Sequence, residues 1–274
     1  MKCGMNSMNN IFHKLFPGKN ETKKEMSHCL NDPEKICPRS YINNKLILVI
    51  GKSGAGKDMY TKNLLQFNQD EIDCEGCPCK KITFKKLSQY TSRPPRNGEE
   101  NNTDYIFLKT DEEVQELLEN TSIFDIRKYT IMNSDSTTGV WYYATNTSDI
   151  NLSNSSYISV GPSTSPVKWV EKYITHFGSN NIILLYIDTP DNDVFEFALE
   201  RENKKDVSRR NYSEFCRRYL DNVAEYANID ERLMEIKKKY NIPIIHVYNE
   251  KATPTEIMMK FGNIYNKIIE LITK

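Results

Sequence analysis

Short runs of apolar residues interrupt an otherwise polar chain, and the segments between them have a helix-like pattern. Strands of this kind are predicted at Leu46–Ile50, Ile182–Ile187 and Ile242–Glu250. A strand that is apolar throughout is typical of a parallel sheet buried between two layers. The last segment, Thr255–Ile272, has apolar residues at helical spacing and predicts a closing amphipathic helix. This alternation predicts an α/β fold, with a parallel sheet flanked by helices.

The first apolar run leads directly into the glycine-rich segment 51–58, which reads Gly-Lys-Ser-Gly-Ala-Gly-Lys-Asp. The pattern Gly-x-x-x-x-Gly-Lys, between a strand and a helix predicted here over Met59–Phe67, forms a cup of backbone N–H groups that binds a nucleotide phosphate. Its lysine reaches the β- and γ-phosphates. We therefore predict a P-loop whose nucleotide contacts come from Gly51, Lys52, Ser53, Gly54, Ala55, Gly56, Lys57 and Asp58.

Asp58 stands where the usual P-loop has a Ser or Thr that holds Mg²⁺. A carboxylate is a hard oxygen ligand, so Asp58 can hold the Mg²⁺ that accompanies the nucleotide, directly or through water. The alternative interpretation is that its negative charge near the phosphates weakens nucleotide binding.

The composition narrows the classes of function. Among 274 residues, 37 Lys and Arg balance 37 Asp and Glu, which gives no support for nucleic-acid binding. No apolar stretch is long enough to cross a bilayer, and the N-terminus has no signal-peptide core. We therefore expect a cytoplasmic protein without a membrane partner, whose seven Cys are reduced thiols. Residues 1–40 are polar and lack periodicity, so they predict a flexible leader.

Three cysteines lie close together after the P-loop helix, at Cys74, Cys77 and Cys79. Their spacing suits metal chelation, but tetrahedral Zn²⁺ needs a fourth ligand, which would come from Cys29, Cys37 or a distant His. A structural Zn²⁺ and a reduced loop without a ligand are both open interpretations.

An arginine-rich turn follows at Tyr90–Glu99, with the sequence Tyr-Thr-Ser-Arg-Pro-Pro-Arg-Asn-Gly-Glu. Its two prolines hold the backbone extended, so Arg93 and Arg96 can present two guanidinium groups at a fixed separation. Such a pair can grip a phosphate monoester through charge-assisted hydrogen bonds. Taken alone, the turn is better explained as a solvated basic surface.

Taken together, the P-loop, this turn and Asp104–Phe107, which reads Asp-Tyr-Ile-Phe, resemble the guanylate kinase family. The resemblance runs with gaps from about Lys45 to the C-terminus and is strongest between Tyr90 and Phe107. It implies a P-loop NTPase fold with a small inserted NMP-binding region and a lid. The implied boundaries are one domain over 41–274, with a core at 41–88, the NMP-binding region at 89–150, and a core with lid at 151–274, the lid being about 202–212.

The resemblance also assigns roles to individual residues. It implies that MgATP is the phosphoryl donor, that Lys57, Arg201 and Arg218 act in catalysis, and that Asn249 lies near the adenine. The resemblance further implies two groups of residues that bind the acceptor nucleotide. One group contacts its phosphate or supports that contact, and the other contacts its base. The first group is Arg93, Arg96, Glu99, Tyr105 and Tyr143, and the second is Gln89, Asp125 and Thr145.

Some positions depart from the family pattern. Gln89 replaces a Ser, Ser159 and Gly161 stand where an Asp-x-Asp pair is expected, and residues 130–139 look like an insertion. We predict a kinase that transfers the γ-phosphoryl group of MgATP to GMP or dGMP, as a monomer or homodimer that binds no nucleic acid. The alternatives are a kinase for another (d)NMP and a catalytically weak binding module.

Overall fold

The computed structural model describes residues 42–69, 82–96, 98–133 and 137–273. The predicted leader at 1–40 and the cysteines Cys74, Cys77 and Cys79 lie outside the described residues, so what is predicted for them stays a prediction. None of the described helices is long and apolar enough to cross a membrane.

The central sheet is parallel, with the strand order β2-β7-β1-β8-β9. β1 lies in its middle, where β7 and β8 pair with its two edges, and all six of its residues are buried. Burying an aliphatic side chain of this kind stabilises the fold by about 1.5–3 kcal/mol. The strands are β1 (Leu46–Gly51), β2 (Phe84–Lys86), β7 (Ser156–Val160), β8 (Ile182–Asp188) and β9 (Ile244–Tyr248).

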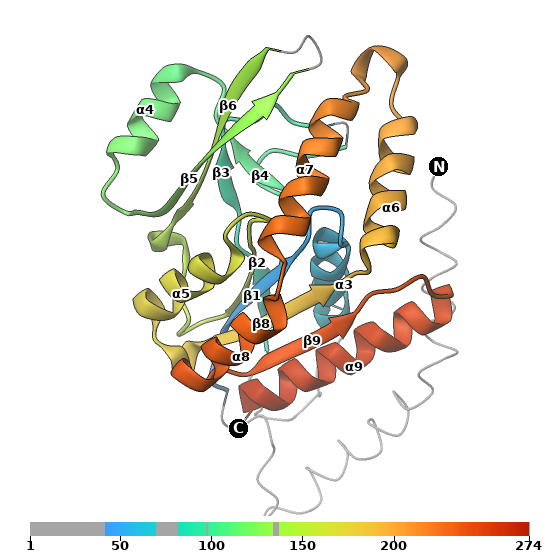
Figure 1. Ribbon diagram of the computed structural model, residues 1–274. Helices are drawn as coiled ribbons and strands as arrows, with labels where there is room; N and C mark the ends of the chain where they lie inside the picture. Colours follow the sequence, from blue (N-terminus) through green and yellow to red (C-terminus); the bar gives the residue numbers. More distant parts are fainter. Residues whose placement is uncertain (1–41, 70–81, 97, 134–136, 274) are drawn as a thin grey trace, which may run out of the picture.

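Helices cover both faces of this sheet (Figure 1). Residues Ile47 and Val49 of β1 belong to one apolar core, with α3 (Lys57–Gln69) and α9 (Pro254–Thr273). The intervening Leu46, Leu48 and Ile50 belong to a second core, with α5 (Pro166–Phe177) and α8 (Ile229–Tyr240). A strand with apolar side chains on both faces needs a helical layer on each side of the sheet. The predicted fold class, a parallel sheet flanked by helices, is therefore confirmed.

A second, smaller sheet, called the small sheet below, has the strand order β4-β3-β6-β5. Its long hairpin includes the predicted insertion at 130–139, because the pairing of β5 with β6 continues to Met132 opposite Thr138. A capping box at Thr110 and Glu113 starts the helix that accompanies it. The elements are β3 (Gln89–Thr91), β4 (Tyr105–Phe107), α4 (Asp111–Glu119), β5 (Ile123–Met132) and β6 (Thr138–Asn146).

Two helices form an arm beside this hairpin (Figure 1). The arm consists of α6 (Asp191–Asn203), the 3-10 turn η4 (Val207–Arg209) and α7 (Tyr212–Glu225). Phe195 of α6 packs edge-on against Phe215 of α7, which holds the two helices together. Two further 3-10 turns, η2 (Thr147–Asp149) and η3 (Ser179–Asn181), connect elements elsewhere.

Candidate functional site

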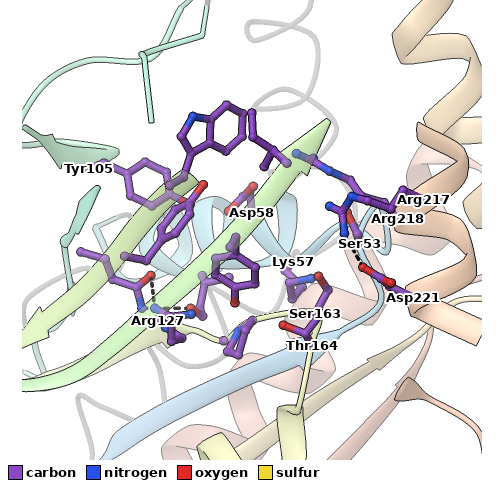
Figure 2. Close-up of a pocket in the computed structure, with 18 of the residues that line it drawn as sticks. Ser53, Lys57, Asp58, Tyr105, Arg127, Ser163, Thr164, Arg217, Arg218 and Asp221 are labelled. Atoms are coloured by element: carbon purple, nitrogen blue, oxygen red, sulfur yellow. Dashed lines mark hydrogen bonds and ion pairs between the residues drawn. The ribbon is translucent and has the colours of Figure 1, made fainter. Parts of the chain in front are cut away.

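A cleft opens between the P-loop, the small sheet and α7 (Figure 2). It contains about 850 Å³ of empty space, part of it open to solvent. Its lining residues are Ser53, Lys57 and Asp58 of the P-loop; Gln89, Arg96, Tyr105, Arg127, Tyr129, Ile131, Trp141 and Tyr143; Val160, Gly161, Pro162, Ser163 and Thr164; and Arg217, Arg218 and Asp221 of α7.

Glycines give the P-loop its shape. Gly54 and Gly56 have φ values of +95° and +89°, a backbone region that other residues rarely adopt. At Gly51 space is the constraint, since a Cβ there would lie 2.7 Å from the carbonyl oxygen of Ile187 on β8. The loop curls at the carboxyl end of β1 and enters α3 at Lys57, which is the geometry that directs backbone N–H groups towards a phosphate.

Asn222 in the last turn of α7 and Tyr226, which directly follows this helix, hold the P-loop in this shape. The side-chain oxygen of Asn222 accepts a hydrogen bond from the Ser53 N–H at 2.8 Å, and its Nδ2 donates to the Ser53 carbonyl at 3.1 Å. The hydroxyl of Tyr226 accepts from the Gly51 N–H at 3.1 Å. The arm and the P-loop are therefore fastened to each other.

Asn249 also braces the P-loop, although the resemblance predicts a position near the adenine. Its Nδ2 donates to the Ala55 carbonyl at 3.0 Å and to the Thr189 hydroxyl at 3.2 Å. Its Oδ1 accepts from the Tyr60 hydroxyl at 3.0 Å, and the residue is 8% exposed. Both amide donors are thus taken by protein groups, and Asn249 does not line the cleft.

The side chain of Lys57 folds back over the P-loop. Its Nζ donates to the carbonyl oxygens of Gly51 at 2.7 Å and Lys52 at 2.9 Å. Burial lowers the pKa of Lys57 to about 8; the charge of Asp58 opposes this shift and that of Arg201 adds to it. A phosphate in the cleft would supply the counter-charge that the ammonium needs in this position.

Asp58 lies beside Lys57 on the wall of the cleft, with an exposed carboxylate. Mg²⁺ in nucleotide sites takes one or two protein carboxylates, keeps several waters and binds the substrate's phosphates. A single exposed carboxylate next to the P-loop lysine fits this pattern. Within the described part of the chain, no three His, Cys, Asp or Glu side chains gather as a preformed metal site. Mg²⁺ at Asp58 would therefore rely on phosphate and water for its other ligands.

Three arginines from separate parts of the chain converge near Lys57. They are Arg96 after β3, Arg201 on α6 and Arg218 on α7. Desolvation and repulsion from Arg93 and Arg218 lower the pKa of Arg96, and desolvation and repulsion from Arg96 and Arg218 lower the pKa of Arg201. An anion placed among these guanidinium groups would relieve the repulsion, so the cluster is suited to a phosphate group.

Arg93, the other arginine of the turn, is buried behind the cleft. Its Nη2 lies 2.9 Å from both carboxylate oxygens of Glu99, and its guanidinium lies over the rings of Tyr105 and Phe107. Glu99 also accepts from the Arg96 N–H at 2.7 Å. Glu99 thus supports both arginines, as the resemblance implies, but Arg93 is 2% exposed and does not line the cleft.

Two predicted phosphate contacts, Tyr105 and Tyr143, do line the cleft. Their rings meet edge-on at a centroid separation of 5.9 Å. Burial raises the pKa of Tyr105 to about 12, so its hydroxyl keeps its proton and can donate to an anion.

At the end of the cleft formed by the small sheet, only one of the three predicted base contacts reaches the lining. Gln89 does so, whereas Asp125 is buried and Thr145, whose hydroxyl accepts from Tyr173 at 3.0 Å, has no exposed surface. Asp125 and Thr145 therefore do not line the cleft, and the base contacts that the resemblance assigns to them stay a prediction. Arg127, which no motif pointed to, occupies the cleft in their place (Figure 2).

The indole of Trp169 occupies the space next to Gly161, one of the two positions where the family resemblance implies a carboxylate. A Cβ on Gly161 would lie 2.7 Å and 2.9 Å from ring atoms of Trp169 and 3.2 Å from Ile50. Trp169 also donates from Nε1 to Asp125 at 2.9 Å. Ser159, the other position of the pair, has no exposed surface.

Comparison with known proteins agrees with this geometry. Residues 43–150 match the family model for guanylate kinase. No curated protein sequence gave a significant match. Among solved structures, the chain is similar to the guanylate kinase from Anaplasma phagocytophilum, with 15% sequence identity and a TM-score of 0.44 over 83% of this chain and 88% of that one. The resemblance predicted from the motifs is confirmed by the family model, and the chain carries a guanylate kinase family domain over residues 43–150.

Proposed function

We propose that the protein is a nucleoside monophosphate kinase that transfers the γ-phosphoryl group of MgATP to a nucleoside monophosphate, with GMP or dGMP as the acceptors that the family match favours. The observation that carries this proposal is the meeting of two anion sites in one cleft. The P-loop with Lys57 forms one wall, and Arg96 with Tyr105 forms another.

On the donor side, the backbone N–H groups of the P-loop and the ammonium of Lys57 would hold the triphosphate. Lys57 would exchange its two carbonyl partners for phosphate oxygens, which stabilises its charged form. Asp58 would hold Mg²⁺, which neutralises charge on the β- and γ-phosphates when it is bound. The adenine contact assigned to Asn249 stays a prediction that its bracing role does not support.

On the acceptor side, Arg96, Tyr105 and Tyr143 would fix the monophosphate, with Arg93 and Glu99 supporting Arg96 from behind. Arg201 and Arg218 would contact the phosphoryl group during transfer, where charge spreads over its equatorial oxygens. No general base is needed, because the attacking group is an ionised phosphate oxygen. Catalysis then consists of positioning and charge stabilisation.

The test is a coupled assay of ADP formation with each common nucleoside monophosphate, comparing the wild type with Arg96→Ala. We expect Arg96→Ala to lower kcat/KM for the acceptor about 100-fold, the usual loss for one charge-stabilising donor. Lys238→Ala, an exposed change on α8, is the matched control and should keep the wild-type rate. ADP formation that no monophosphate stimulates would contradict the proposal.

The second interpretation is a catalytically weak binding module. It draws support from Ser159 in β7 and from Gly161 just after this strand, because neither position has the expected carboxylate. Calorimetry with MgATP separates the two interpretations. Micromolar binding together with phosphoryl transfer supports the kinase. The absence of any heat of binding at millimolar MgATP would favour the module.

A further inference from the structure

The base end of the cleft presents a cation where the family resemblance predicts a carboxylate. The side chain of Arg127 lines the cleft and is 14% exposed, whereas that of Asp125 is 4% exposed and does not line it. Residues two apart on a strand share a face, so the two side chains stand next to each other on β5. Arg127 is the member of the pair that a ligand meets.

Asp125 is held away from the cleft by partners on several sides. Its Oδ2 accepts from Trp169 Nε1 at 2.9 Å and lies 3.0 Å from Arg127 Nε, while its Oδ1 lies 3.6 Å from Lys172 Nζ. Turning this carboxylate towards a base would break these contacts and leave Arg127 without its counter-charge. Removing one partner of a buried ion pair is strongly unfavourable, so Asp125 is a positioning residue for Arg127.

Gln89 completes the orientation of Arg127. Its Oε1 accepts from Arg127 Nη2 at 3.0 Å, and its Nε2 donates to the Val160 carbonyl at 3.1 Å. The amide oxygen that could accept from a base N–H already accepts one hydrogen bond from Arg127. Although burial disfavours the guanidinium charge, Asp125 raises the pKa of Arg127, so Arg127 stays protonated and its N–H groups remain donors.

Arginine has five N–H donors; Nη2 of Arg127 donates to Gln89, whereas Nε lies beside Asp125 as an ion pair, so the guanidinium keeps further donors. The base end of the cleft thus offers donors. Reading the N1–H and amino groups of guanine would require acceptors there. Tyr129 and Trp141 line the same cleft, and their rings can pack against the face of any base.

We infer that Arg127 contacts the base of the acceptor nucleotide and selects bases that present hydrogen-bond acceptors. This inference rests on the proposed function. The shared chemistry is a keto group at the edge that meets Arg127: O6 with N7 of guanine, or a carbonyl oxygen of thymine or uracil. Adenine is disfavoured, because it places an amino donor beside its N7. Guanine, if accepted, is read without its exocyclic amine.

The first experiment measures kcat/KM of the full-length wild type with dGMP, GMP, IMP, dTMP, UMP and AMP. A good bidentate contact discriminates by about 5–150-fold, so the best keto base should exceed AMP by at least 10-fold. IMP, which is GMP without the exocyclic amine, should match GMP within about threefold. The 7-deaza analogue of dGMP tests whether the keto base is guanine or a pyrimidine. It should be a poorer acceptor than dGMP only if Arg127 contacts guanine N7.

The second experiment repeats the panel with Arg127→Met and Arg127→Lys, and with Lys128→Ala as the control on the opposite, exposed side of β5. Arg127→Met should bring the ratio between keto bases and AMP close to one, whereas Lys128→Ala should leave the ratio unchanged. A purely structural Arg127 would lower all rates in parallel. Arg127→Lys keeps a cation beside Asp125. Compared with Arg127→Met, it should fold normally and regain part of the preference for keto bases over AMP.

Two results would overturn the inference: an unchanged base ranking in Arg127→Met, or an IMP value more than 10-fold below GMP that disappears in Asp125→Asn. Absence of phosphoryl transfer with every acceptor contradicts the proposed function instead. In that case the same ranking is measured by calorimetric binding of each monophosphate. No binding of any monophosphate at millimolar concentration would overturn the inference as well.

Discussion

Asn222 on α7 forms two hydrogen bonds with the backbone of Ser53 in the P-loop, at 2.8 Å and 3.1 Å, and is itself 2% exposed. These hydrogen bonds connect Ser53 of the P-loop to α7, the helix of the arm that carries Arg218. A change at Asn222 should therefore affect both the stability of the fold and the affinity for the nucleotide.

Asn222→Ala removes both hydrogen bonds and leaves the N–H and carbonyl of Ser53 without these partners. We expect a loss of about 1–3 kcal/mol in the free energy of unfolding and weaker ATP binding, because the loop is no longer held in its binding shape. Thermal unfolding with and without MgATP measures both effects. Val223→Ala changes an exposed neighbour on α7 and should stay within about 0.5 kcal/mol of wild type. Equal behaviour of the two variants would contradict the bracing role.

Lys57 gives ATP binding a pH dependence. With a pKa of about 8 in the free protein, Lys57 is protonated below pH 8 and loses its charge as the pH rises above it. The charged form binds phosphate, so ATP affinity should be constant near pH 7 and fall between pH 8 and 9.5. Lys57→Met should bind weakly with no dependence on pH in this range. If the variant keeps the same decline, another group is responsible.

The packing around Gly161 leaves no room for the carboxylate that the family resemblance implies at this position. In Gly161→Asp the new Cβ would lie 2.7 Å from the buried ring of Trp169, which also holds Asp125. We expect destabilisation of about 3 kcal/mol or more from overpacking and a buried charge. Urea unfolding of Gly161→Asp and of the double variant with Trp169→Leu tests the cause. Recovery in the double variant supports the steric explanation, and no recovery contradicts it.

The features that lie within one continuous segment could be predicted from the sequence. The P-loop and the strands at Leu46 and Ile182 were found because a short motif or an apolar run determines them locally. The capping box at Thr110 and Glu113 is also a local signal, since two residues three apart mark the start of α4. Leu233 and Ile236, at helical spacing, likewise marked α8.

The base end of the cleft could not be predicted in this way, because it depends on a residue far away in the chain. Asp125 aligns with the family's base contact, but Trp169 on α5 binds its carboxylate and fills the space beside Gly161. Arg127 lines the cleft beside this buried carboxylate. The role of Asn249 was set in the same way, by Ala55 and Thr189.

Glu214 of α7 joins the arm to the small sheet. Its carboxylate accepts from Arg217 at 2.7 Å, from Arg218 at 2.6 Å and from the backbone N–H of Met132 on β5 at 3.1 Å. Burial opposes ionisation, but the hydrogen bonds from Arg217 and Arg218 outweigh it and lower the pKa of Glu214 to about 2 from an ordinary 4.5. The charged carboxylate thus stabilises the folded state.

A carboxylate with a lowered pKa contributes stability that is fully present above its unfolded pKa of 4.5 and is lost as the pH falls towards 2. A shift of this size corresponds to something on the order of 3 kcal/mol. Glu214→Gln should therefore be less stable than wild type at pH 7, and the difference should shrink between pH 4.5 and pH 2. Urea unfolding across this range measures it, with the exposed Glu235→Gln on α8 as the control. A constant difference at all pH values would mean that Glu214 acts through packing rather than charge.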